Sequence, residues 1–268
     1  MQIEDYYECN ETLEYNSGIL RTTHGERDVR YAIVDGYAVI EGDIIIGTAE
    51  ELKEPPCLKG HVITAPPGNR WPGGVLKYMV ADDLTGIERV INAIKHWESR
   101  TGIRFEQISS KSENHVLFKP GSGCSSYVGM VGKGRQPIIL HSNCSTGNVI
   151  HEIGHALGLW HEHTRLDRDS YITVNWKNIK RGKEHNFEKH RYNGMPLGPY
   201  DYGSIMHYST RAFSKNSQPT ITVHDSTPTG QRKSLSVGDI AAIGAIYEVG
   251  QNDLNGVAAA LANPAIRS

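Results

Sequence analysis

The eleven residues 151–161, HEIGHALGLWH, constrain this chain more than any other segment. His151 and His155 are four residues apart, so on a helix they project from the same face and can bind one metal ion together. Gly158 allows the helix to end and the backbone to turn sharply, which brings His161 round as a third ligand. The pattern therefore predicts a helix over about residues 146–158 that carries a metal site.

The predicted site has the chemistry of a catalytic zinc ion. Three protein ligands leave one coordination position open for water, and this distinguishes catalytic zinc sites from structural ones. Zinc lowers the pKa of its water from about 15.7 to about 7, and Glu152, beside the first ligand, can act as the general base. The alternative is a surface helix with scattered histidines, but the positions between the ligands carry core-type residues. They are Ala156, Leu157, Leu159 and Trp160.

Other motifs accompany this segment. Glu162 directly follows the third histidine, and residues 204–208, SIMHY, come about forty residues downstream. The long zinc motif with a methionine turn resembles the metzincin metalloproteases, and these two further features resemble the astacin family within that group. Residues 70–74 (RWPGG), residues 121–129 (GSGCSSYVG) and the spacing of Cys124 to Cys144 match the same family. The resemblance covers about residues 62–250.

The resemblance assigns roles around the metal. It implies that the three histidines bind one zinc ion and that Glu152 is the general base and proton shuttle. Met206 would form an apolar floor beneath the metal. Tyr208 would be a fifth ligand that leaves when substrate binds and then stabilises the oxyanion, as a phenol hydroxyl in that place can. Either residue alone would be interpreted as ordinary core packing.

Further roles implied by the resemblance are structural. Glu162 would meet the new N-terminus of the mature enzyme, and its alternative is a solvated carboxylate at a helix end. Arg165 is interpreted as structural. Cys124 and Cys144 match a family disulfide, which would contribute on the order of 3 kcal/mol.

Composition excludes several classes of protein. The formal net charge is -2, no basic run is interleaved with aromatics, and the apolar stretches at 44–46 and 257–262 are too short to span a bilayer. We therefore expect no nucleic acid and no membrane as partners. The resemblance implies protein or peptide substrates and an activating protease. Disulfide use favours an oxidising compartment. Since residues 1–5 begin no signal peptide, we expect a secreted protein whose signal has been removed.

Residue patterns divide the chain into three segments. The resemblance implies that residues 1–61 are a propeptide and residues 62–250 an astacin-like catalytic domain, and the small and polar residues 251–268 predict a loosely held tail. Short strands are predicted around 31–36 and 37–40, and further strands over 75–80, 103–105, 115–118 and 137–140. Helices are predicted over 87–97, with Thr85 as N-cap, and over 236–247. The fold class expected is α+β. The resemblance implies a two-subdomain protease, with a twisted mixed sheet and two helices above a loop-rich C-terminal half that ends in a final helix.

The N-terminal segment contains a candidate for latency. Residues 40–44, IEGDI, resemble the aspartate-switch motif of astacin propeptides, which usually carries an aromatic residue where Ile40 stands. Asp43 would then bind zinc in place of the catalytic water, as a carboxylate can. One alternative is a plain Gly-Asp turn between two strands. Another is a thiolate from Cys9 or Cys57 on the zinc, unless these two cysteines pair with each other. We hypothesise Asp43, with Cys9 as the alternative.

Together these features predict a secreted zinc endopeptidase, made as a latent zymogen and activated by cleavage near residues 60–70. The alternative is a non-catalytic binding protein on a metzincin scaffold, whose sign would be the loss of Glu152 or of a ligand. A hydrolase of non-peptide substrates is a third possibility. The family often favours acidic residues just after the scissile bond, for which Arg181, Arg191 or Arg211 could supply the basic side chain.

Overall fold

The structure is a computed structural model, and it describes residues 15–22, 25–51, 69–109, 113–189 and 197–247. Three α-helices, eleven strands and several short 3-10 helices are assigned within these ranges. In chain order they are β1 Tyr15–Thr22, β2 Gly25–Val34, β3 Tyr37–Ile40, β4 Ile44–Thr48, η2 Pro72–Gly74, β5 Val75–Val80, α1 Glu88–Glu98, β6 Arg104–Gln107, β7 His115–Pro120, β8 Cys124–Tyr127, β9 Arg135–Leu140, α2 Thr146–Ala156, η3 Glu162–Thr164, η4 Arg168–Ser170, β10 Ile172–Val174, η5 Trp176–Asn178, η6 Glu184–Phe187, β11 Ile221–Val223 and α3 Val237–Tyr247.

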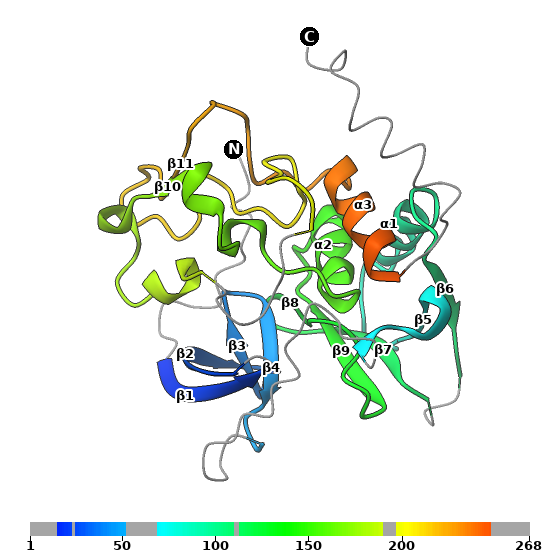
Figure 1. Cartoon of the computed structure of the whole chain (residues 1–268). Helices are drawn as coiled ribbons and strands as arrows, with labels where there is room; N and C mark the ends of the chain where they lie inside the picture. The colour runs from blue at the N-terminus through cyan, green and yellow to red at the C-terminus, as the bar shows by residue number, and fades with distance from the viewer. Residues whose placement is uncertain (1–14, 23–24, 52–68, 110–112, 190–196, 248–268) are drawn as a thin grey trace, which may run out of the picture.

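A mixed sheet organises the described part of the chain. Its nine strands follow the spatial order β1-β2-β3-β4-β8-β9-β7-β5-β6. Strands β1 to β4 are mutually antiparallel, as are β8 and β9, whereas the remaining neighbours are parallel. The helices lie above this sheet, and a small pair of strands, β10 and β11, lies within the loops of the C-terminal half (Figure 1). The α+β fold expected from the sequence is confirmed.

The four N-terminal strands extend the same sheet that the later strands form. Strand β4 pairs with β8 in parallel, with Ile44 opposite Ser126 and Ile45 opposite Tyr127. The sequence predicted two short strands here, around 31–36 and 37–40, which correspond to β2 and β3. It predicted neither β1 nor β4, nor that the strands would continue the sheet of the next segment. A tight turn joins β3 to β4. Because β4 pairs with β8, this turn lies beside β8, close to helix α2 (Figure 1).

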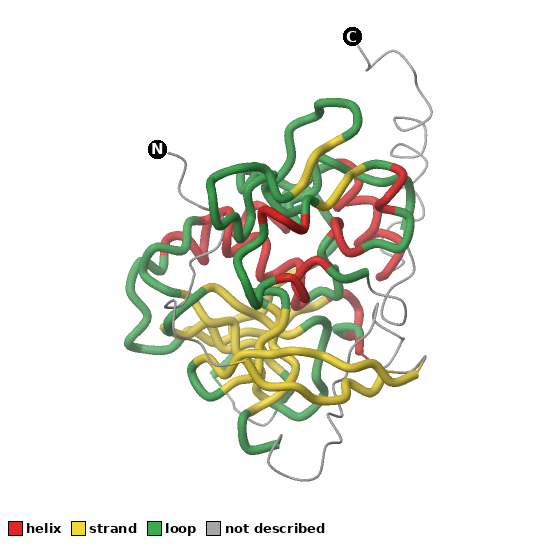
Figure 2. The backbone as a smooth tube through the Cα atoms, turned by 90° about the vertical axis from the view of Figure 1, so that its left-hand side faces the viewer, coloured by secondary structure: helices red, strands yellow, loops and turns green. Residues whose placement is uncertain are grey.

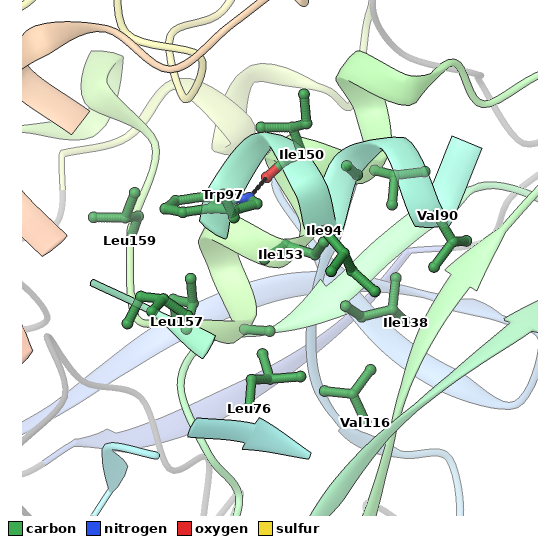
Figure 3. Packing of buried hydrophobic residues seen from close by; sticks show 14 of the residues in the cluster. Leu76, Val90, Ile94, Trp97, Val116, Ile138, Ile150, Ile153, Leu157 and Leu159 are labelled. Atoms are coloured by element: carbon green, nitrogen blue, oxygen red, sulfur yellow. Dashed lines mark hydrogen bonds between the residues drawn. The ribbon is translucent and has the colours of Figure 1, made fainter. Parts of the chain in front are cut away.

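The main apolar core lies between the sheet and the helices α1 and α2 (Figure 3). Two buried indoles fix α2 in place: Trp71 Nε1 donates to the carbonyl of Ala156 at 2.8 Å, and Trp97 Nε1 donates to that of Ile150 at 3.1 Å. Burial of such apolar side chains contributes about 1.5–3 kcal/mol each. The labelled members of the core are Leu76, Val90, Ile94, Trp97, Val116, Ile138, Ile150, Ile153, Leu157 and Leu159.

The N-cap predicted for helix α1 was wrong. Thr85 does not cap it: the helix begins at Glu88, and Ile87 stands at the N-cap without a side-chain cap. Gly86 has φ +65°, which places a turn between Thr85 and the helix. The carbonyl of Thr85 instead accepts a hydrogen bond from the guanidinium of Arg89 at 3.2 Å.

Helix α2, which carries the histidine motif, is capped at its N-terminus and ends earlier than predicted. Ser145 and Asn148 form a capping box, in which each side chain binds the other residue's main-chain N–H. The helix ends at Ala156, two residues earlier than the predicted end at Gly158. Gly158 has φ +109°, a conformation that glycine adopts without strain, so the predicted sharp turn is present.

The C-terminal half consists mainly of loops, which lie above the sheet in Figure 2, and ends in α3. The predicted final helix is confirmed, since α3 spans Val237–Tyr247. The predicted disulfide is also present and joins Cys124 in β8 to Cys144 just before α2. In the described ranges, no helix has the length and apolar character that crossing a bilayer requires.

Candidate metal centre

Four buried side chains converge at the centre of the described molecule. Asp43, His151, His155 and His161 each offer one ligand atom, and these atoms lie within 4.8 Å of one another. Asp43 Oδ2 is 3.3 Å from His151 Nε2 and 3.2 Å from His161 Nε2, and Asp43 Oδ1 is 3.8 Å from His155 Nε2. None of the four exposes more than 3% of its surface. The motif of α2 and the turn between β3 and β4 therefore meet at one point.

The hydrogen bonds of the Nδ1 atoms, which face away from the cluster, orient the three histidines so that they can bind a cation. The Nδ1 atom of each histidine lies 2.8 Å from an oxygen that can only accept a hydrogen bond. The pairs are His151 with the carbonyl of Ile205, His155 with the carbonyl of Leu159, and His161 with the carboxylate of Glu41. Each Nδ1 therefore carries the hydrogen, and in the neutral ring Nε2 presents its lone pair to the cluster.

A cation fits the space between these groups. His155 Nε2 and Asp43 Oδ1 are buried and have no hydrogen-bond partner. Lone pairs on imidazole nitrogens and on a carboxylate repel one another unless a positive charge lies between them. Three imidazole nitrogens with one carboxylate oxygen match the donors and the coordination number that Zn²⁺ prefers. The donor set therefore supports the zinc site that the sequence predicted.

The electrostatics of the cluster agree with this fit. Burial lowers the pKa of His161, but Asp43 and Glu41 outweigh burial and raise that pKa to about 9. Burial and, to a smaller extent, the charge of Arg232 lower the pKa of His151 to about 4, although Asp43 opposes this shift. The carboxylates thus favour a positive charge beside them, whereas burial keeps the rings of His151 and His155 neutral, an arrangement that suits a metal ion.

Glu152 lies beside the cluster on α2. It is buried, and its Oε2 atom has no hydrogen-bond partner. Burial raises its pKa well above the ordinary value, and Asp43 adds to this rise, whereas Arg232 lowers it. A carboxyl group in this position can hold and release a proton next to the metal.

The methionine turn lies under the histidines. Met206 is buried, and a Cβ atom placed on Gly154 of α2 would be 2.9 Å from its sulfur, so the helix and the turn are in close contact. Tyr208 is also buried; its ring stacks on His163 with centroids 3.5 Å apart. The hydroxyl of Tyr208 donates to the carbonyl of Glu41 at 2.5 Å.

A carboxylate of helix α3 supports this turn. Asp239 is buried and accepts hydrogen bonds from the hydroxyl of Ser204 at 2.6 Å and from the N–H groups of Ile205 and Ser236, each at 2.9 Å. The carbonyl of the same Ile205 orients His151. Asp239 therefore fixes Ile205, whose carbonyl orients the metal ligand His151. No sequence motif indicated this role.

Glu162 is only 15% exposed in its side chain and is well bonded. Its Oε1 accepts from Arg165 at 3.0 Å and from the N–H of Asp201 at 2.8 Å. Arg165 also binds Asp167 and the carbonyls of Gly198 and Pro199, in keeping with the structural role expected for it. Burial raises the pKa of Glu162 to about 7.

Some candidates from the sequence are not among the residues that the structure describes at the centre. Cys9, Cys57 and Arg191 lie outside the described residues. Arg181 and Arg211 are exposed, and Arg211 binds the carbonyl of Ser217.

Two residues that act on the centre were not among the candidates. Arg232 lies near α2, and its backbone carbonyl packs against Gly147 of that helix at a point where no Cβ would fit. No local pattern distinguishes this arginine from the others. Glu41 was also missed, although the motif that contains Asp43 could have directed attention to it.

A histidine-rich helix with a downstream methionine turn over a mixed sheet agrees with the metzincin-type zinc site that the sequence predicted. The sequence profile of the Astacin peptidase family matches residues 63–248. The chain belongs to the astacin family, and His151, His155 and His161 are its zinc ligands.

Similar proteins agree with this assignment. Blastula protease 10 of Paracentrotus lividus is 43% identical over 192 residues, which cover 67% of this chain and 32% of that protein. Tolloid-like protein 1 of Homo sapiens is 40% identical over 188 residues, 66% of this chain and 19% of that protein. The chain thus spans less than a third of either relative. High choriolytic enzyme 1, a hatching enzyme zinc-protease from Oryzias latipes, has 34% identity and a TM-score of 0.62, covering 67% of this chain and 93% of that one.

Proposed function

We propose that this chain is a secreted, latent zinc endopeptidase in which residues 1–61 are a propeptide, residues 62–250 are the catalytic domain and residues 251–268 are a loosely held tail. Its substrates are proteins or peptides. The observation that carries the proposal is the carboxylate of Asp43 among the three zinc-binding histidines, 3.2 Å from His161 Nε2 and 3.3 Å from His151 Nε2. A ligand from the N-terminal segment occupies the position that a catalytic site keeps open for water.

The residues around the metal supply peptide hydrolysis once that position is free. Zn²⁺, when bound, polarises the scissile carbonyl and acidifies water. Glu152 takes the proton from the attacking water and passes it to the amine that leaves. The hydroxyl of Tyr208 donates a hydrogen bond to the oxyanion as negative charge develops. The buried side chain of Met206 forms an apolar floor beneath the histidines and excludes water from that side of the metal site.

Latency depends on the hydrogen bonds that hold the N-terminal strands against the later part of the chain. The carbonyl of Asp43 accepts the N–H of Ser126 in β8 at 2.9 Å, and Asp35 accepts both the N–H and the hydroxyl of Ser122 at 2.7 Å. These bonds hold the segment along β8 and keep Asp43 at the metal. Cleavage by an activating protease near residues 60–70 would release it. Cys9 remains the alternative blocker.

The proposed preference is for substrates with an acidic residue just after the scissile bond. The family often has this preference, and Arg232 supports it here because its charge reaches both Glu152 and His151. Secretion is supported by the Cys124–Cys144 disulfide, since such bonds persist in oxidising compartments.

The test compares the intact chain with a form cut near residue 62, on a generic protein substrate, with and without a zinc chelator. We expect chelator-sensitive activity only after the cut, and activity in the intact chain for Asp43→Ala. The variant Glu152→Gln, cut in the same way, should lose about 100- to 10,000-fold in kcat. Activity in the intact unmodified chain would overturn latency. Silence of the cut form with zinc bound would favour the non-catalytic binding protein.

A further inference from the structure

One of the three residues that orient the zinc ligands comes from the N-terminal segment. His151 and His155 donate through Nδ1 to carbonyls of the segment matched to the astacin family. His161 donates instead to the carboxylate of Glu41, which lies between β3 and β4. If cleavage releases this segment, His161 loses its partner while the other two histidines keep theirs.

The turn that contains Glu41 does not by itself require a glutamate. Glu41 has φ +53° and Gly42 has φ +84°, the left-handed region in which glycine, asparagine and aspartate are favoured. A glutamate here is strained by its Cβ atom. Its side chain is nevertheless buried, with only 4% exposed, and its carboxylate is 2.8 Å from His161 Nδ1. The contact with His161, rather than the turn, accounts for the residue.

We propose that Glu41 is a zinc-retention residue: the N-terminal segment supplies the outer carboxylate that makes His161 a stronger ligand. A carboxylate on the outer nitrogen of a ligating histidine fixes the ring and increases its basicity toward the metal, and loss of such a partner typically costs about 10- to 100-fold in affinity. The inference rests on the latency proposed above, in which Asp43 supplies the fourth ligand. The uncleaved chain therefore holds zinc more tightly than the cleaved one.

The main chain of the same residue makes an independent contact. The carbonyl of Glu41 accepts the hydroxyl of Tyr208 at 2.5 Å. Substitutions of the Glu41 side chain keep this carbonyl, so they leave the hydrogen bond from Tyr208 in place. Release of the whole segment removes both contacts together and frees Tyr208 as well.

The experiment measures zinc release from the uncut, zinc-loaded full chain into excess chromogenic chelator. In Glu41→Asn, the side chain still suits a left-handed turn but is one methylene shorter and carries no charge. We expect release to be about 10- to 100-fold faster than from the unmodified chain. Glu41→Gln keeps an acceptor without the charge, so its release rate should lie between the two.

A matched control removes a different carboxylate of the same segment. Glu51 lies after β4 and pairs with Lys133 at 3.0 Å, and both side chains are about half exposed. Because exposed pairs contribute little, Glu51→Gln should release zinc within about twofold of the unmodified rate. Equal acceleration by Glu51→Gln and Glu41→Asn would overturn the proposal, since any loosening of the segment would then suffice.

A second background separates a direct effect from one that acts through Asp43. In Asp43→Asn, the fourth ligand is weakened while Glu41 remains. If Glu41 acts on His161 itself, Glu41→Asn accelerates release in this background too; if it merely seats Asp43, the acceleration disappears and the proposal fails. An unmodified release rate in Glu41→Asn would also refute it. No substrate is involved, so a chain that releases zinc as expected but cuts no protein would refute the proposed function alone.

Discussion

Arg232 is a residue whose role near the centre no sequence pattern suggested, although its charge acts on two residues there. It donates to the carbonyls of His207 and Gln231, at 3.1 and 3.0 Å, and these bonds hold its guanidinium near α2. Its charge lowers the pKa of both Glu152 and His151. A fixed positive charge beside Glu152, the proposed general base, would receive the acidic substrate side chain that the proposed preference requires.

The substitution Arg232→Gln tests this role of a single side chain. We expect kcat/KM to fall about 10- to 100-fold for a peptide with aspartate just after the scissile bond, because a charge-assisted hydrogen bond is lost. The matched peptide with asparagine at that position should lose much less. The measurement is the ratio of the two kcat/KM values with the cut enzyme. A ratio equal to that of the unmodified enzyme would assign the preference elsewhere.

Among the helices and turns, the contact between α2 and the methionine turn supports the metal site. Gly154 lets the sulfur of Met206 approach the helix, since an added Cβ would lie 2.9 Å from it. We expect Gly154→Ala to lower the free energy of unfolding by about 1–3 kcal/mol, despite alanine's better helix propensity, because the site is overpacked. Denaturant unfolding measures this loss. Met206→Ala in the same chain should offset part of it, and purely additive losses would contradict the contact.

Helix α3 has a different part in the same site. The carboxylate of Asp239 accepts from Ser204, Ile205 and Ser236, and Ile205 in turn orients His151. Asp239→Ala leaves these buried donors unpaired, so we expect a loss of about 1–3 kcal/mol in stability. A thermal unfolding scan of the zinc-free chain measures it without any contribution from the metal. The variant Asp225→Ala, at an exposed loop position, should change little and serves as the control.

Across the molecule, the N-terminal strands and the later strands form one sheet whose junction is β4 with β8. The amide of Ser126 donates to the carbonyl of Asp43 across this junction, and Ser126 is fully buried. Release of the segment would therefore leave β8 as an edge strand with an unpaired amide.

Hydrogen exchange at this amide reports that event. We expect Ser126 to exchange slowly in the intact chain and much faster after the cut near residue 62 and removal of the fragment. Ile138, which lies opposite Ser126 on β9, provides the reference because β9 keeps its other neighbour, β7. If the Ser126 amide stayed as protected as before, the fragment would still occupy the sheet.

The local parts of this protein could be predicted from its sequence. A spacing of four on a helix sets which face carries His151 and His155, and Gly158 with its positive φ provides the turn to His161. Periodicity likewise predicted α1, α3 and most strands, because hydrophobic patterns and glycines act over a few residues. The predicted N-cap of α1, Thr85, was wrong, because Gly86 forms a turn and Arg89 bonds to distant carbonyls of 141, 142 and 144, which no local pattern shows.

The distant groups that surround the metal could be found only in the folded molecule. Glu41 reaches His161 across 120 positions, and Arg232 reaches the helix of His151 from much later in the chain. The parallel pairing of β4 with β8 brings Asp43 to the histidines, and no local pattern encodes that pairing. Side-chain chemistry and helix geometry act over short distances along the chain, whereas the partners of a buried charge depend on which strands share a sheet.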